Sequence, residues 1–330
     1  MSVSQCETGH PIDAERRRLL QLSAFGVLFS LGVPPARSFA AAPASPGAEI
    51  AEIAPGVFVH RGEHGAYTRE NRGDISNCGF VVGRDAVAVI DTGGTAAVGR
   101  DLLAAIRTRT DRPVRYVVNT HMHPDHVLGN AAFRGDGVSF IGHQKLAAAL
   151  SARAERYLTY NREAAGEAAF AGTEIVLPDT PVVDTLDVDL GGRRLQLRAH
   201  PTAHTDNDLT VRDIVTDTVF MGDLIFAGHV PTIDGSIRGW MALLEDLVAQ
   251  PAARIVPGHG PAAMPWPAAA EPLRRYLEAV ATDVRAAIRA GRGIRETMSS
   301  AAAAERSQWE LFDDYHARNI AASFAELEWE

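Results

Sequence analysis

Short apolar runs alternate with longer amphipathic stretches along residues 49–260. The run Val114-Arg115-Tyr116-Val117-Val118 is short and rich in β-branched side chains, which predicts a strand. Residues 95–108 repeat apolar side chains at Val98, Leu102 and Ile106, and this spacing predicts a helix. By the same criteria we expect strands at 49–53, 56–60, 78–82, 86–90, 138–141, 186–190, 194–198, 209–211, 219–221 and 254–256, and helices at 143–169 and 239–248. The pattern predicts a mixed α/β domain.

Residues 268–330 differ from the rest of the chain because they are alanine-rich and mostly helical in pattern. We expect a break at Gly291-Arg292-Gly293, since glycine destabilises a helix interior. After the break, aromatic and aliphatic side chains recur at roughly helical spacing and form a packing face: Trp309, Phe312, Ile320 and Phe324. The sequence therefore predicts a main domain over residues 43–267 and a C-terminal helical extension, residues 268–330, packed on it.

Residues 1–42 have the features of an export signal. Arg16-Arg17-Arg18 precede an apolar stretch, and Ser38-Phe39-Ala40 offers a small-residue cleavage site. The arrangement resembles a twin-arginine signal, which predicts a periplasmic protein with a cleaved signal. The apolar stretch is shorter than the ~20 residues of a membrane-spanning helix, so we expect no stable span after cleavage. A retained membrane anchor is the alternative.

Composition and charge narrow the classes of partner. The chain of 330 residues is 46% hydrophobic and 22% charged, and its net charge of −9 argues against a nucleic-acid partner. Lys145 is the only lysine, so we expect arginine or a metal to hold any anionic group of a small-molecule substrate. Signal cleavage would remove Cys6 and leave Cys78 alone, which argues against a disulfide framework.

Four side chains that can bind metal fall within six residues: His121, His123, Asp125 and His126. They follow the apolar run 114–118, and Pro124 suits the first position of a helix. A loop here can turn His121 and His123 toward one point, while Asp125 and His126 reach a second point beside it. Imidazole and carboxylate together suit zinc, and also iron or manganese. The stretch therefore predicts a metal site.

The stretch His121-x-His123-x-Asp125-His126 resembles the signature of the metallo-β-lactamase superfamily. Four further marks of that superfamily occur in order along the chain: Asp91-Thr92-Gly93, Ala203-His204-Thr205, Gly222-Asp223 and Pro257-Gly258-His259-Gly260. The resemblance implies an α/β fold, a four-layer αβ/βα sandwich. It also implies a metal-dependent hydrolase.

The resemblance also implies a ligand set for two zinc ions per chain, with iron as the alternative metal. The first ion would take His121, His123 and His204, the second Asp125, His126 and His259, and Asp223 would bridge them. Asp125 and Asp223 would also be the catalytic carboxylates, since they stabilise a metal-bound hydroxide that attacks the substrate. Asp91 would either orient a ligand histidine or cap a helix, and both roles stay open.

His200 and His204 compete for the place of the third histidine. Thr205-Asp206-Asn207 follow His204 and place it on a connecting loop, where metal ligands commonly lie. His200 instead precedes Pro201, which favours extended backbone and a plain packing role at the end of a strand. We therefore expect His204 to be the ligand.

A narrower resemblance rests on residues 234–240, 190–193 and 326–330, which look like the quinoprotein relay system zinc metallohydrolases. It implies an exported hydrolase of an ester, thioester or lactone, linked to a PQQ-dependent quinoprotein dehydrogenase or a cytochrome as its periplasmic partner. Alternatives are a mononuclear iron enzyme like the persulfide dioxygenases and a non-catalytic accessory protein. Trp240, in the first of these stretches, would either line the substrate pocket or belong to the core.

Overall fold

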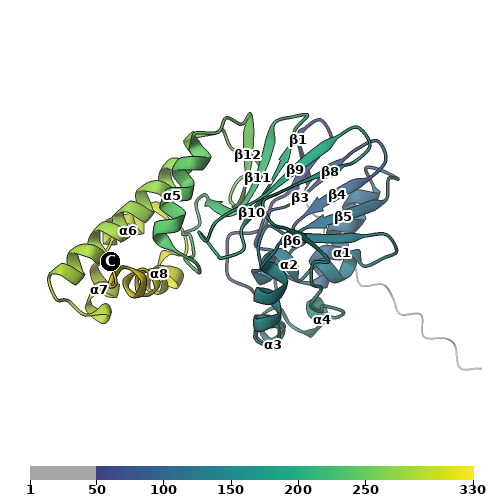
Figure 1. The fold of residues 1–330 in the computed structure, drawn as a ribbon. Coiled ribbons are helices and arrows are strands. Elements are labelled where there is room, and N and C mark those ends of the chain that lie inside the picture. The colour runs from purple at the N-terminus through teal and green to yellow at the C-terminus, as the bar shows by residue number, and fades with distance from the viewer. Residues whose placement is uncertain (1–49) are drawn as a thin grey trace, which may run out of the picture. The chain divides into compact units, whose positions relative to one another are not determined.

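The computed structural model describes residues 50–330 (Figure 1). The expected export signal, residues 1–42, and Cys6 lie outside the described residues, so export and signal cleavage stay predictions. Within residues 50–330 every helix is too short or too polar to cross a membrane. Cys78 is buried and free of any disulfide.

The strands form a seven-stranded sheet and a five-stranded sheet. In the first sheet the neighbours from β1 to β4 are antiparallel, and those from β4 to β7 are parallel. Its strands are β1 (Ile50–Ala54), β2 (Val57–His60), β3 (Cys78–Val82), β4 (Val87–Ile90), β5 (Val114–Val118), β6 (Ser139–His143) and β7 (Thr180–Val182).

The second sheet has the order β12-β11-β10-β9-β8, and only its β11–β12 pair is parallel. Its strands are β8 (Thr185–Asp189), β9 (Arg194–Ala199), β10 (Leu209–Asp213), β11 (Thr218–Phe226) and β12 (Arg254–His259). β11 is buried along its whole length, which fits a strand covered on both faces.

The two sheets face each other across a core of aliphatic side chains, among them Val59, Ile90, Leu197, Val211 and Val256. On the outer face of the first sheet, Leu102 and Ile106 of α1 (Ala96–Arg107) pack in one cluster with Phe80 and Val89. On the outer face of the second lie α5 (Ile237–Val248) and α6 (Glu271–Arg289) (Figure 1). Helices, sheet, sheet and helices make four layers, which confirms the predicted sandwich.

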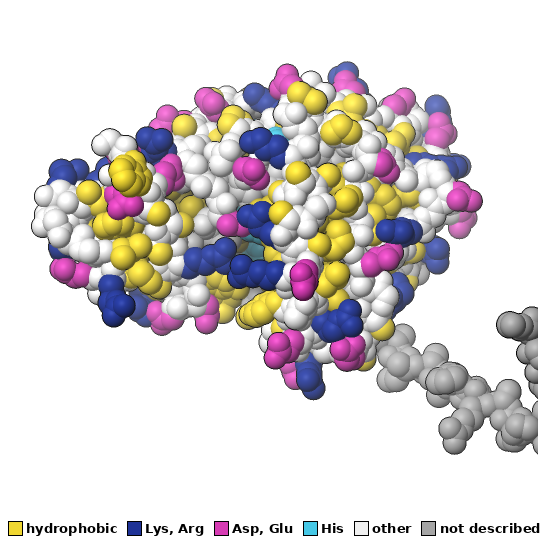
Figure 2. Space-filling view, turned by 60° about the horizontal axis from the view of Figure 1, so that its bottom comes forward, with side chains coloured by type: hydrophobic (Ala, Val, Ile, Leu, Met, Phe, Trp, Pro, Cys, Tyr) yellow, Lys and Arg dark blue, Asp and Glu magenta, His cyan; other side chains and the backbone are white. Residues whose placement is uncertain are grey.

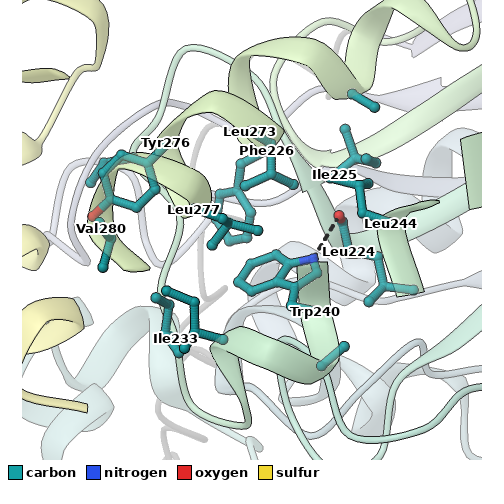
Figure 3. Packing of buried hydrophobic residues seen from close by; sticks show 14 of the residues in the cluster. Leu224, Ile225, Phe226, Ile233, Trp240, Leu244, Leu273, Tyr276, Leu277 and Val280 are labelled. Carbon is teal, nitrogen blue, oxygen red and sulfur yellow. Dashed lines mark hydrogen bonds between the residues drawn. The ribbon is translucent and has the colours of Figure 1, made fainter. Parts of the chain in front are cut away.

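The C-terminal helices share one core with the second sheet. Figure 3 shows Trp240 of α5 among Leu224 and Phe226 of β11 and Leu273 and Tyr276 of α6. The break between α6 and α7 (Ile294–Ser300) falls at the expected glycines, and α8 (Phe312–Leu327) follows. Of the expected packing face, Trp309, Phe312 and Ile320 are buried and Phe324 is partly buried in this core.

Several boundaries differ from the predicted ones. β11 extends to Phe226, so Asp223 lies inside a strand and not after it, because the parallel pairing with β12 continues past residue 222. The expected helix 143–169 divides into α3 (Leu146–Ala165) and α4 (Glu167–Phe170) at Gly166, whose φ of 82° ends the first helix. β7 was not predicted, since it is three residues long and contains Pro181.

Candidate metal centre

The histidine-rich stretch connects the end of β5 to α2 (Pro124–Val127), with His123 in extended backbone just before Pro124. Asp91, at the end of β4, fixes this connection. Its carboxylate accepts hydrogen bonds from the Thr120 N–H at 2.8 Å and from Thr120 Oγ1 at 2.7 Å. The backbone of Asp91 has a φ of 57°, a left-handed conformation that Asp tolerates better than most residues.

One group of potential ligands consists of His121, His123, His204 and Asp223, whose candidate ligand atoms all lie within 4.8 Å of one another. His204 Nε2 lies 3.0 Å from His123 Nδ1 and 3.3 Å from Asp223 Oδ2, and His121 Nε2 lies 3.6 Å from the same oxygen. Ligands about 2.1 Å from a tetrahedral metal are about 3.4 Å apart. The spacing therefore fits ligands of one ion.

A second group consists of Asp125, His126 and His259. Asp125 Oδ2 lies 3.4 Å from His126 Nε2 and 3.3 Å from His259 Nε2. Asp223 joins this group through its other oxygen, since Oδ1 lies 3.2 Å from His126 Nε2 and 3.6 Å from His259 Nε2. Asp223 thus faces the first group with Oδ2 and the second with Oδ1, the position of a bridging carboxylate.

The ring nitrogens that face away from the two groups are hydrogen-bonded. Where the partner is a carbonyl or carboxylate oxygen, the ring must donate, so its other nitrogen keeps a lone pair for a metal. The donors are His126 Nδ1 to Asp91 Oδ2 at 2.8 Å, His204 Nδ1 to the Thr232 carbonyl at 2.7 Å, His259 Nδ1 to the Ile75 carbonyl at 2.8 Å, and His123 Nε2 to Asp234 Oδ2 at 3.0 Å.

Three atoms at the centre have no hydrogen-bond partner although they are buried: His121 Nε2, His126 Nε2 and Asp223 Oδ1. Buried polar atoms are normally hydrogen-bonded, because an unpaired one costs about 1–3 kcal/mol. These atoms point at the same two places as the other ligand atoms. The donor set, its spacing and its unpaired atoms all fit two metal ions.

The charge states differ between the two groups. Burial lowers the pKa of His204 to about 3 and that of His121 well below its usual value, so both are neutral. Burial also opposes protonation of His259, but the charges of Asp223 and Asp125 outweigh it and raise the pKa of His259 to about 9. A metal ion at the second group would therefore compete with a proton on His259.

The structure places the competing candidates clearly. His204 lies in the first group, whereas His200 Nε2 lies 2.9 Å from Thr210 Oγ1 and belongs to neither group. Asp91 holds His126, and the N-cap of α1 is Thr95, so the orienting role fits and the capping role does not.

Trp240 is completely buried, and its Nε1 donates to the Leu224 carbonyl at 3.2 Å (Figure 3). Its ring lies 5.2 Å from that of His204. Trp240 therefore packs behind a ligand as a core residue, and the pocket alternative is wrong.

Two residues near the centre were not singled out from the sequence. Asp234 accepts the hydrogen bond of His123, and its signals in the sequence were its place in the motif stretch 234–240 and in a loop shortly after Asp223. His229 is buried and its ring lies 5.0 Å from that of His259. No motif marks His229, because its position depends on how the segment after β11 turns back.

The sequence matches the family model of the metallo-beta-lactamase superfamily over residues 71–259. Two curated relatives are similar over part of their length. The linear primary-alkylsulfatase of Pseudomonas sp. (strain ATCC 19151) is 39% identical over 49 residues, which are 15% of this chain and 9% of that protein. Metallo-beta-lactamase domain-containing protein 1 of Mus musculus is 29% identical over 183 residues, which are 52% of this chain and 58% of that protein.

Solved structures resemble the fold at low sequence identity. TMB-1 aligns with a TM-score of 0.55 and 20% identity over 71% of this chain and 98% of its own. A metallo-beta-lactamase from Pontibacter korlensis gives 0.55 and 20% over 70% and 99%. A double mutant of the sec-alkyl sulfatase PisA1 aligns with a TM-score of 0.64 and 14% identity over 86% of this chain and 51% of its own.

The family match spans more than half of the chain and contains every member of both groups of candidate ligands. The chain therefore belongs to the metallo-beta-lactamase superfamily.

Proposed function

We propose that the chain is a dinuclear zinc hydrolase. The observation that supports this most strongly is the position of Asp223, whose two oxygens face two separate groups of ligand atoms. A mononuclear iron site would need only one of these groups. A non-catalytic accessory protein would need neither, and the outer hydrogen bonds that orient the histidines would have no purpose.

Four carboxylates would have two kinds of role at the metal centre, charge compensation and the orientation of histidines. Bound zinc supplies Lewis acidity and a nucleophile derived from water at neutral pH. Burial alone would raise the pKa of the Asp125 and Asp223 carboxyls, but their histidine neighbours lower it well below the usual value. Both carboxylates are therefore ionised and would offset the charge of two cations. Asp91 and Asp234 hold His126 and His123 in the orientation that ligation requires.

The substrate class is part of the proposal. We infer an ester, thioester or lactone, because an electrophilic acyl carbon suits this chemistry and the sequence resembles hydrolases of that kind. Two of the similar proteins are named as alkyl sulfatases, so an alkyl sulfate belongs in the substrate panel.

The link to a quinoprotein dehydrogenase is also a proposal, and it rests on the motif stretches 190–193, 234–240 and 326–330. Two of these stretches contact each other. Glu326 accepts hydrogen bonds from Ser236 Oγ at 2.6 Å and from the Ile237 N–H at 2.8 Å. These hydrogen bonds tie α8 to the start of α5 and to the loop that carries Asp234.

Metal content and turnover on one sample test the function. Protein spanning residues 43–330 would be purified from the periplasm, analysed for metals, and assayed on ester, thioester, lactone and alkyl sulfate substrates. We expect two zinc ions per chain, hydrolysis of an acyl substrate, loss of turnover with chelator and its recovery with zinc. One iron per chain without hydrolysis would favour a mononuclear iron enzyme like the persulfide dioxygenases. Two zinc ions without turnover would favour a non-catalytic accessory protein.

Export through residues 1–42 has its own test. Replacing Arg16, Arg17 and Arg18 together with lysine should keep the protein in the cytoplasm, because the twin-arginine signal depends on paired arginines. Fractionation of cells that express either form measures this. Undiminished recovery of the triple variant from the periplasm would refute it.

A further inference from the structure

Two arginines from distant parts of the sequence meet beside the metal centre. Arg153 lies on α3 and Arg318 on α8, and both face the carboxylate of Asp234. Arg153 Nη2 lies 3.8 Å from Asp234 Oδ2, and Arg318 Nη2 lies 3.6 Å from Oδ1. Figure 2 shows dark blue Lys or Arg side chains around a hollow near the middle of one face.

Asp234 accepts no hydrogen bond from either guanidinium group. Both distances exceed the range of a hydrogen bond, so the two Nη2 groups keep their capacity to donate, while Arg153 Nη1 donates to the Ala149 carbonyl at 3.4 Å. One carboxylate faces two positive charges, which leaves a net positive charge at this place. The side chains of Arg153 and Arg318 are 37% and 60% exposed, so a ligand can reach them from solvent.

The pair lies close to the ligand groups. Asp234 accepts the hydrogen bond of His123 Nε2, while His123 Nδ1 belongs to the first ligand group. An imidazole is roughly 2 Å across and a zinc–nitrogen bond adds about 2 Å, so the Arg153 guanidinium lies within about 11 Å of the metal position. A substrate of ordinary size can span this distance.

Each helix adds a tyrosine on the same face as its arginine. Tyr157 is four residues after Arg153, and Tyr315 is three residues before Arg318, which are the spacings of neighbours on a helix surface. Burial, with a further contribution from the charge of Asp125, raises the pKa of Tyr315 to about 12 and raises that of Tyr157 as well. Both phenols therefore stay neutral, and both lie within electrostatic range of Asp125 in the second ligand group.

We propose that Arg153 and Arg318 form an anion-binding subsite, so that the preferred substrate carries a carboxylate or comparable anionic group several bonds from the scissile bond. This inference rests on the proposed hydrolase function. It also gives the C-terminal extension a role, since α8 supplies half of the subsite.

A matched pair of esters tests the subsite. Mono-4-nitrophenyl suberate carries a free carboxylate at the far end of its acyl chain, and 4-nitrophenyl octanoate has the same length without it. In Arg153→Gln/Arg318→Gln, we expect kcat/KM to fall about 10- to 100-fold for the suberate, because two charge-assisted contacts are lost. For the octanoate it should stay within about twofold, with unchanged zinc content.

Arg156→Gln is the matched control, since Arg156 is an exposed arginine on the same helix. It should leave both esters unaffected if the effect needs these particular side chains and not merely positive charge. An unchanged suberate-to-octanoate ratio in the double variant, with zinc retained, would overturn the subsite and leave the hydrolase function standing.

A binding measurement separates the two proposals if neither ester turns over. Calorimetric titration of zinc-loaded protein with monomethyl suberate and with dimethyl suberate compares an anion with a neutral analogue. Tighter binding of the anion to the wild type, lost in Arg153→Gln/Arg318→Gln, would keep the subsite while the hydrolase function fails. Equal affinity of wild type and double variant for the anion would overturn the subsite.

Discussion

Replacing His204 with alanine removes one of the four ligand atoms of the first group and should cost most of one metal equivalent. Structural zinc sites bind with about 10–16 kcal/mol, so one ligand of four is worth roughly 3–4 kcal/mol. This corresponds to a loss of affinity of about 100- to 1000-fold. The three remaining ligand side chains, His121, His123 and Asp223, would still meet, which is why the loss is partial and not complete.

The same substitution also affects the surroundings of the site. His204 is completely buried, and its Nδ1 donates to the Thr232 carbonyl, which would lose its partner. The ring also packs 5.2 Å from Trp240 and 5.6 Å from Phe226. We therefore expect a decrease of about 2–4 kcal/mol in the free energy of unfolding, from the unpaired carbonyl and the cavity.

Metal analysis after dialysis against a competing chelator measures the effect, with ester hydrolysis on the same samples. His200→Ala is the matched control, because His200 is also a buried histidine but bonds Thr210 and belongs to neither ligand group. We expect His204→Ala to lose most of one zinc equivalent and nearly all turnover, and His200→Ala to keep both zinc ions. Metal loss in the His200 variant with full occupancy in the His204 variant would refute the assignment.

Three further predictions concern carboxylates. Asp91→Asn should keep the fold, because asparagine tolerates the φ of 57°. It should weaken zinc binding about 10- to 100-fold, because His126 loses its carboxylate partner, and wild-type affinity in a chelator competition would contradict this. Glu326→Ala should lower the free energy of unfolding by about 1–3 kcal/mol in urea titrations, because Ser236 and Ile237 lose their acceptor, and an unchanged midpoint would count against that role. Burial raises the pKa of Asp208 to about 8, above its unfolded value, so metal-free protein should lose roughly 1.4 kcal/mol of stability per pH unit as the pH rises from about 4 to about 8. Asp208→Asn should remove this slope between pH 6 and 8, and identical slopes would rule out the explanation.

The candidate ligands could be named from the sequence because four of them stand in one short stretch and the others stand in motifs of the superfamily that the chain resembles. His121, His123, Asp125 and His126 fall within one connection between a strand and a helix, so their convergence needs no knowledge of distant contacts. The preference for His204 over His200 followed from the loop after His204 and from Pro201, and the structure brings His204 to the other candidate ligands. A sequence pattern can therefore predict which side chains converge when those side chains are close together in the sequence.

The partners of the ligands were harder to predict because they depend on long-range packing. Asp234 reaches His123 only because the segment after β11 turns back over the centre. Arg318 reaches Asp234 from the last helix, whose orientation no periodicity fixes. Trp240 has the same helical spacing whether it faces a pocket or a core, and its burial is decided by α6 packing against α5. Periodicity gives the buried face of an element but not the element that covers it.

Anomalous diffraction at the zinc edge, from crystals of the zinc-loaded protein, tests most directly whether Asp223 joins two metal ions. The proposed function predicts two peaks about 3.5–4 Å apart. One should lie among His121, His123 and His204 and the other among Asp125, His126 and His259, with one oxygen of Asp223 toward each. A single peak at full occupancy in crystals grown with excess zinc, or no peak at these residues, would contradict it.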